Sequence, residues 1–202
     1  MKIAHVETLI SKGKYARSAT WAELRASILD DIRQIDWPPG SGMFTIYPQS
    51  GKKRGEGNGV ARIKDGFIER LIAKGWEKEL PLDLATRRRP GKLDVVNRVG
   101  TITIALEWET GNISSSHRAL NKMALGILKG ALQVGLLVVP SRNLYRFLTD
   151  RVGNFDELEP YTDLWKSLRI AEGVLEIIVV EQDAESTSVP RIPKGTDGRA
   201  RQ

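Results

Sequence analysis

Residues 107–118, with the sequence EWETGNISSSHR, join the end of an apolar run to the start of an amphipathic helix. Glu107 and Glu109 alternate at the end of that run, and alternate residues of a strand share a face. A Thr-Gly pair then breaks the strand, and apolar residues recur at helical spacing from Leu120 onward. The stretch therefore predicts a strand that presents two carboxylates beside a helix N-terminus.

A third carboxylate, Asp94, is expected to join this pair. Residues 92–97 and 101–109 both have strand patterns, and the Asn-Arg-Val-Gly between them is typical of a turn. In an antiparallel hairpin that folds back near residue 99, Asp94 lies opposite or diagonal to residues 105–107. Carboxylates crowded on one patch of sheet raise one another's pKa unless a cation lies among them. A hard divalent cation with oxygen ligands, Mg²⁺ above all, is the usual solution.

The helix that follows is predicted to have Ser114 or Ser115 as its N-cap and to end near Gly130. A helix N-terminus attracts phosphate groups through its free amides and its dipole. A carboxylate cluster, a cation and such a helix end together suggest phosphodiester chemistry. The hydrogen-bonding side chains at this helix end are Asn112, Ser114, Ser116 and Arg118.

Length and composition predict one domain of ordinary globular character, with 202 residues, 41% hydrophobic and 28% charged. The chain has no cysteine, which excludes disulfides, zinc–thiolate sites and thiol nucleophiles and fits a reducing cytoplasm. We find no signal-peptide pattern and no apolar run as long as a membrane span, so we expect a cytoplasmic protein without a membrane partner. The net charge of +6 mildly favours a polyanionic partner.

The remaining pattern predicts an α/β fold, a central mixed β-sheet flanked by helices, because the order from Asp94 onward is β-β-α-β-α-α-β. Helices are expected over 14–35, 63–76, 141–149 and 154–168, strands over 43–47, 131–139 and 174–181, and a flexible basic loop over 48–59.

Residues 183–202 form a tail with almost no large apolar residues and no periodicity. Its basic, Gly- and Pro-containing composition predicts disorder when the tail is alone. We expect a single domain over 1–182 and a basic C-terminal arm over 183–202. Such an arm suits a nucleic-acid groove, although a frayed terminus explains the composition equally well.

An Asp on one strand and Glu-x-(Glu/Lys) about a dozen residues later resembles the core motif of the PD-(D/E)xK nucleases, although this motif is short and common. Longer strings are more specific, and they resemble the type II restriction endonucleases of the BamHI family. The resemblance extends from Phe44 to the tail, and it implies a restriction-endonuclease-like fold in a shorter member of the family. The strings are EWETGNISSSHR at 107–118, NK at 121–122, LTDRV at 148–152, ELEPY at 157–161 and VPRIPKGTDG at 189–198.

The resemblance implies catalytic roles for the acids. Asp94, Glu107 and Glu109 match the catalytic carboxylates of the family, and Glu79 is chosen over Glu77 as a further metal-site residue. Asp94, Glu107 and Glu79 would hold Mg²⁺. Glu109 stands where most of the superfamily has Lys, and a carboxylate there can act as general base.

The resemblance also implies contacts with double-stranded DNA. The implied target is the palindrome GGATCC, cut within each strand by a homodimer to leave 5′ overhangs, and the helix over 114–129 is a candidate dimer element. Residues matching base-reading positions in the major groove are Asn112, Ser114, Arg118, Asp150 and Arg151; Lys64 matches a lysine near the DNA; and Lys194, Gly195, Asp197 and Gly198 match an arm that enters the minor groove.

Two other classes of function remain open from the residues. A sequence-specific DNA-binding protein without activity would use the same Asn, Arg and Asp contacts, although three intact acids disfavour it. A glycosidase also uses paired carboxylates, but it needs an aromatic-lined sugar cleft and no metal, and the basic charge disfavours it. Without the resemblance, acids on an exposed strand face that are paired to Lys or Arg would be the preferred explanation of the cluster.

Overall fold

The computed structural model describes residues 1–53, 55–78, 80–81, 91–149 and 152–194. The strands are β1 (Lys2–Lys12), β2 (Thr45–Ile46), β3 (Glu77–Lys78), β4 (Val95–Val99), β5 (Ile102–Trp108), β6 (Val134–Pro140), β7 (Gly173–Glu181) and β8 (Ala184–Glu185). The helices are η1 (Tyr15–Arg17), α1 (Ala19–Arg33), α2 (Ala61–Ala73), α3 (Ile113–Leu128), α4 (Arg142–Tyr145), α5 (Phe155–Leu158), η2 (Glu159–Tyr161) and α6 (Thr162–Lys166).

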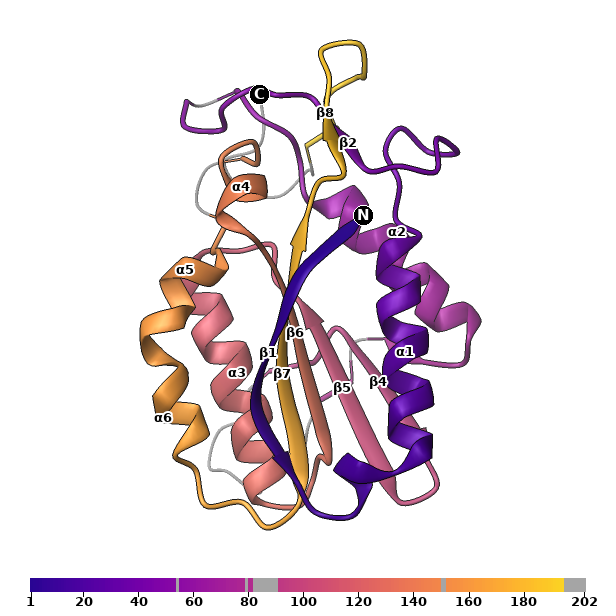
Figure 1. Ribbon diagram of the computed structural model, residues 1–202, viewed down its shortest axis with the longest axis vertical. Helices are drawn as coiled ribbons and strands as arrows, with labels where there is room; N and C mark the ends of the chain where they lie inside the picture. Colours follow the sequence, from indigo (N-terminus) through magenta and orange to yellow (C-terminus); the bar gives the residue numbers. More distant parts are fainter. Residues whose placement is uncertain (54, 79, 82–90, 150–151, 195–202) are drawn as a thin grey trace.

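A six-stranded mixed sheet, in the order β1-β7-β6-β5-β4-β3, lies at the centre and has helices on both faces (Figure 1). Strands β5, β6 and β7 run parallel, and β1, β4 and β3 pair antiparallel to their neighbours. Helices α1 and α2 cover one face, while α3, α5 and α6 cover the other (Figure 1). All residues of β6 are buried, because a strand covered on both faces is apolar throughout. The predicted α/β fold is confirmed.

Strand β1 was not predicted from the sequence. Its pairing with β7 contains two register shifts, between Ile3 and His5 and between Thr8 and Ile10. A β-bulge changes which face the following side chains point to, so the alternation of apolar and polar residues is lost. Leu9 and Ile10 are consequently both buried although they are adjacent.

The central hairpin is antiparallel as predicted, but its turn lies at Gly100 and Thr101, because residues 97–99, expected in the turn, belong to β4. Strands β4 and β5 pair antiparallel with Val95 opposite Leu106. Asp94 directly precedes β4, so the same register places it next to Glu107. The hairpin therefore brings two acids that are 13 residues apart in the chain to neighbouring positions.

Several helices are shorter than predicted. Helix α2 ends at Ala73, since Gly75 has a φ of +89° and leaves the helical path. The helix predicted over 154–168 is divided into α5, η2 and α6 around Pro160, which lacks an amide hydrogen. Asn154 is the N-cap residue of α5 as predicted, and its backbone amide donates to Glu157 Oε2 at 3.2 Å. The described helices include no apolar stretch long enough to cross a bilayer.

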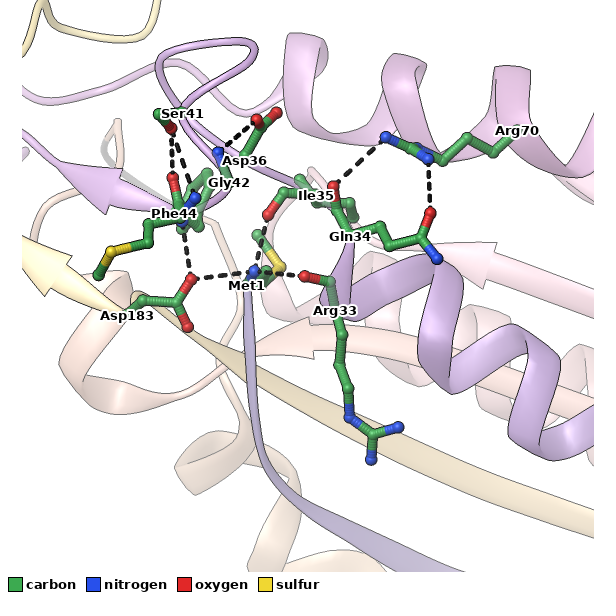
Figure 2. Close-up of polar contacts among 11 residues, drawn as sticks. Met1, Arg33, Gln34, Ile35, Asp36, Ser41, Gly42, Phe44, Arg70 and Asp183 are labelled. Carbon is green, nitrogen blue, oxygen red and sulfur yellow. Dashed lines mark hydrogen bonds and ion pairs between the residues drawn. The ribbon is translucent and has the colours of Figure 1, made fainter.

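Residues 183–194, part of the tail predicted to be disordered when alone, pack against the rest of the protein. Strand β8 pairs parallel with β2, and Ile192 is buried in the core. Figure 2 shows Asp183 at the start of this segment, where its Oδ2 atom accepts from Phe44 N at 2.7 Å and lies 3.0 Å from the Met1 ammonium. A few specific contacts thus order a segment whose composition is polar.

Candidate active site

The three predicted acids lie together at one end of the central hairpin. Asp94 directly precedes β4, Glu107 lies near the end of β5, and Glu109 directly follows that strand. All three line one open pocket of about 630 Å³, which Lys64 of α2 also lines. From the other side, α3 contributes Ser115, Arg118, Ala119 and Lys122 to the pocket. Carboxylates, cations and the start of a helix therefore face the same space.

Both carboxylate oxygens of Asp94 have partners. Oδ2 accepts a hydrogen bond from Trp108 N at 2.8 Å, which fixes the carboxylate against the neighbouring strand. Oδ1 accepts from Lys64 Nζ at 2.6 Å in a partly buried ion pair. The carboxylate is thus oriented by the sheet, and its second oxygen is directed towards a cation.

Glu107 forms an ion pair with Lys122, and both side chains are largely buried. Lys122 Nζ also donates to Lys92 O at 2.6 Å, so it connects α3 to the segment that leads into β4. Burial raises the pKa of Glu107 above its ordinary value, and the nearby charge of Asp94 raises it further. The ammonium groups of Lys122 and Lys64 act in the opposite direction on this pKa.

Glu109 has a different environment from the other two acids. Its Oε1 atom accepts a hydrogen bond from Gly111 N at 2.7 Å, at the turn between β5 and α3. Burial raises the pKa of Glu109, the amide of Gly111 lowers it, and the charge of Asp94 raises it. The acids therefore influence one another electrostatically, as expected for groups that share a pocket.

The donors in this pocket suit a hard cation. In the conformation observed, no three Asp, Glu or His side chains of the described residues converge closely enough to hold a metal ion. Instead, the ammonium groups of Lys64 and Lys122 neutralise Asp94 and Glu107. Both lysine counter-ions are cations held by these carboxylates, and carboxylate oxygens are also the donors that Mg²⁺ prefers.

The N-terminus of α3 differs from the prediction in its cap. Asn112, and not Ser114 or Ser115, is the N-cap, because its side chain accepts a hydrogen bond from Ser115 N at 3.3 Å. Ser114 is exposed on the first turn. Arg118 is exposed one turn later and donates from Nη2 to Ser115 Oγ at 3.0 Å. Of the predicted base-reading residues of this helix, Arg118 lines the acid pocket, and Asn112 and Ser114 are exposed at the start of α3.

Comparison with known proteins identifies the family of the chain. Residues 1–199 match the profile of the family described as Restriction endonuclease BamHI. The chain belongs to this family. It is 44% identical to the type II restriction enzyme OkrAI of Oceanobacter kriegii over 99% of each chain. It is 35% identical to the type II restriction enzyme BamHI of Bacillus amyloliquefaciens over 96% of this chain and 87% of that enzyme.

This membership makes the chain a type II restriction endonuclease, a site-specific deoxyribonuclease. A crystal structure of the restriction endonuclease BglII complexed with a DNA 16-mer is also similar, with a TM-score of 0.57 and 10% identity. The similarity covers 91% of this chain and 79% of that one. At this identity it shows a shared restriction-endonuclease-like fold.

Several predicted site residues lie outside the residues that the structure describes: Glu79, Asp150, Arg151, Gly195, Asp197 and Gly198. Glu77, the alternative to Glu79, is exposed on β3 and forms an ion pair with Arg98, so it does not line the acid pocket. Lys194 is half-buried and lines another pocket, which lies beside the start of α2.

Lys122 was missed as a site residue from the sequence alone. It follows Arg118 by four positions, so both lie on one face of α3. It also lies between buried Ala119 and Met123 on the core side of that helix. A lysine at a core-facing position needs a partner, and that expectation could have identified it.

Proposed function

We propose that this restriction endonuclease requires Mg²⁺, acts as a homodimer and cuts both strands of GGATCC to leave 5′ overhangs. The observation that carries the proposal is that Asp94, Glu107 and Glu109 line one open pocket together with residues from the start of α3. The similarity to OkrAI and BamHI supports the choice of target. A palindromic target has two-fold symmetry, which a symmetric dimer matches.

In the proposed mechanism, Asp94 and Glu107 would hold the metal, with Glu79 as a further ligand implied by the resemblance. Bound Mg²⁺ supplies a Lewis acid that makes water a better nucleophile and stabilises charge on the leaving oxygen. Glu109 accepts a proton from the attacking water as general base. The amide of Gly111 holds Glu109 in position through its hydrogen bond to Oε1.

We assign base recognition to residues that the resemblance implies, and three of these have exposed side chains in the structure. Asn112, Ser114 and Arg118 lie on the first turns of α3, next to the acids, where a helix N-terminus also favours a phosphate. Arg can bridge guanine O6 and N7, and Asp can accept from cytosine N4, so Asp150 and Arg151 would together read one G·C pair. Residues 183–202 are proposed as an arm that contacts DNA from Lys194 onward, with Lys64 near the backbone.

A plasmid with one GGATCC sequence tests the proposal directly. We expect linear DNA in the presence of Mg²⁺, and no cutting when EDTA is present. Sequencing of the ends would give the cut position in each strand. A protein that binds the plasmid specifically but does not cut it in Mg²⁺ would instead be an inactive DNA-binding protein. That function is compatible with the ion pairs of Asp94 and Glu107 with lysines.

The role of Glu109 is tested by Glu109→Lys. We expect a loss of cutting of about 10²-fold or more, because an ammonium group cannot accept the proton that a general base takes. Initial rates on the same plasmid at saturating Mg²⁺ would measure this loss. The matched Glu69→Lys change, on the exposed face of α2, controls for the added charge. Cutting by Glu109→Lys at the rate of the unchanged protein would show that no carboxylate base is needed at this position.

A further inference from the structure

The two lysines in the acid pocket are held in different ways. Lys64 is on α2, its side chain is 25% exposed, and it lines the open pocket. Among the described residues, its Nζ atom contacts Asp94 Oδ1 at 2.6 Å. A partly exposed lysine with a flexible side chain can move its ammonium group into solvent at moderate cost.

Lys122 has much less freedom. Its side chain is 8% exposed, and its Nζ atom both pairs with Glu107 and donates to Lys92 O at 2.6 Å. Removing a buried ammonium from two acceptors would leave a carboxylate and a carbonyl without that donor, which is costly. Lys122 is therefore a fixed counter-ion.

The two carboxylate oxygens of Asp94 have different partners. Oδ2 is bound by the Trp108 amide, so the carboxylate does not rotate freely, and Oδ1 is the oxygen that Lys64 occupies. An ammonium group at 2.6 Å and a divalent cation repel each other strongly on the same oxygen. A cation that binds Oδ1 must therefore displace Lys64.

We propose that Lys64 is an internal competitor of the divalent cation for Asp94, whereas Lys122 remains on Glu107 when the metal binds. In the metal-free protein Lys64 reduces the repulsion between Asp94 and Glu107, and its departure is part of metal binding. The inference rests on the proposed function, since it concerns how Mg²⁺ reaches this site. It assigns to Lys64 a role on the protein itself, separate from contact with DNA.

Mg²⁺ binding to the DNA-free, chelator-treated protein, measured by titration calorimetry, tests this role. In Lys64→Met the dissociation constant for Mg²⁺ is expected to fall about fivefold, the size of one partly exposed ion pair. Lys74→Met is the matched control, because Lys74 Nζ forms an ion pair of the same length, 2.6 Å, with Asp31 Oδ2 and lies outside the acid pocket. The control should bind Mg²⁺ as the unchanged protein does.

Thermal unfolding provides a second measurement on the same proteins. Ligands that bind the native state raise the unfolding temperature according to their affinity. Mg²⁺ should therefore raise it more in Lys64→Met than in the unchanged protein, and equally in Lys74→Met and the unchanged protein. Mg²⁺ binding by Lys64→Met that is equal, weaker or undetectable would overturn the inference. Plasmid cutting by the unchanged protein separates this inference from the proposed function. If the unchanged protein cuts in Mg²⁺ but Lys64→Met does not bind Mg²⁺ more tightly, the competitor role alone is refuted. If the unchanged protein does not cut in Mg²⁺, the nuclease mechanism is refuted.

Discussion

Asp94→Asn is expected to lower the rate of DNA cleavage at least about 10³-fold, or about 4 kcal/mol of activation free energy. Asparagine has the shape of aspartate, and its amide oxygen can still accept from Trp108 N, which now binds Asp94 Oδ2 at 2.8 Å. It lacks the negative charge that holds a divalent cation and that pairs with Lys64. Single-turnover cleavage of a short duplex with saturating enzyme would measure the loss.

Specific DNA binding should persist in the same variant. The substitution removes one negative charge from a surface that approaches phosphates, so affinity is expected to stay equal or increase. A gel-shift assay in EDTA, with specific and random duplexes at one salt concentration, would show this. Asp30→Asn is the control, since Asp30 forms an exposed ion pair with Arg33 on α1. Near-normal cutting by Asp94→Asn would refute the metal role, and parallel loss of binding and cutting would assign Asp94 to DNA affinity or to the fold.

The acids of this site could be predicted because the information is local. Period-two alternation puts Glu107 and Glu109 on one face, and a tight turn at Gly100 and Thr101, close to the predicted fold-back, sets the hairpin register that brings Asp94 beside them. Their counter-ions could not be predicted in this way. Lys64 and Lys122 reach the acids from α2 and α3, and such contacts depend on how helices pack against the sheet rather than on spacing in the chain.

The same distinction explains the errors in the fold. Bulges in β1 remove the alternation that identifies a strand, and Pro160 divides a helix whose apolar spacing looks continuous. The packing of 183–194 could not be predicted from composition, which measures average apolar content. Order in this segment depends on individual contacts, such as the buried Ile192 and the hydrogen bond from Trp37 Nε1 to Pro190 O at 2.7 Å.

Asn58→Ala is expected to lower the free energy of unfolding by about 3 kcal/mol. Asn58 is fully buried, although it lies in a Gly-rich stretch predicted to be a flexible loop. Its Nδ2 donates to Tyr47 O and Phe147 O, each at 2.9 Å, and its Oδ1 accepts from Ile192 N at 3.1 Å. Alanine would remove all three hydrogen bonds and leave the Ile192 amide without this acceptor in a buried position.

Urea unfolding followed by tryptophan fluorescence would measure the loss of stability. Asn143→Ala is the matched control, because Asn143 is exposed and donates a single longer hydrogen bond, 3.3 Å, to Glu181 Oε2. That change should cost about 0.5 kcal/mol or less. An Asn58→Ala protein as stable as the control would show that the other contacts of residues 183–194 are sufficient to hold this segment.

Trypsin would report where the Asn58→Ala protein loosens. The Arg191–Ile192 bond is a trypsin site beside the Asn58 contact, and Gly59 N also donates to Ile192 O at 2.9 Å. The chain approaches Gly59 so closely that a Cβ there would lie 2.1 Å from Pro193 O. Loss of the Asn58 bonds should therefore speed cleavage at Arg191 before the sheet unfolds. Lys194 lies two residues after Ile192, whose amide Asn58 binds. Asn58 therefore holds the chain at the point from which the proposed DNA-contacting arm begins, and a buried side chain in a loop determines where this surface segment starts.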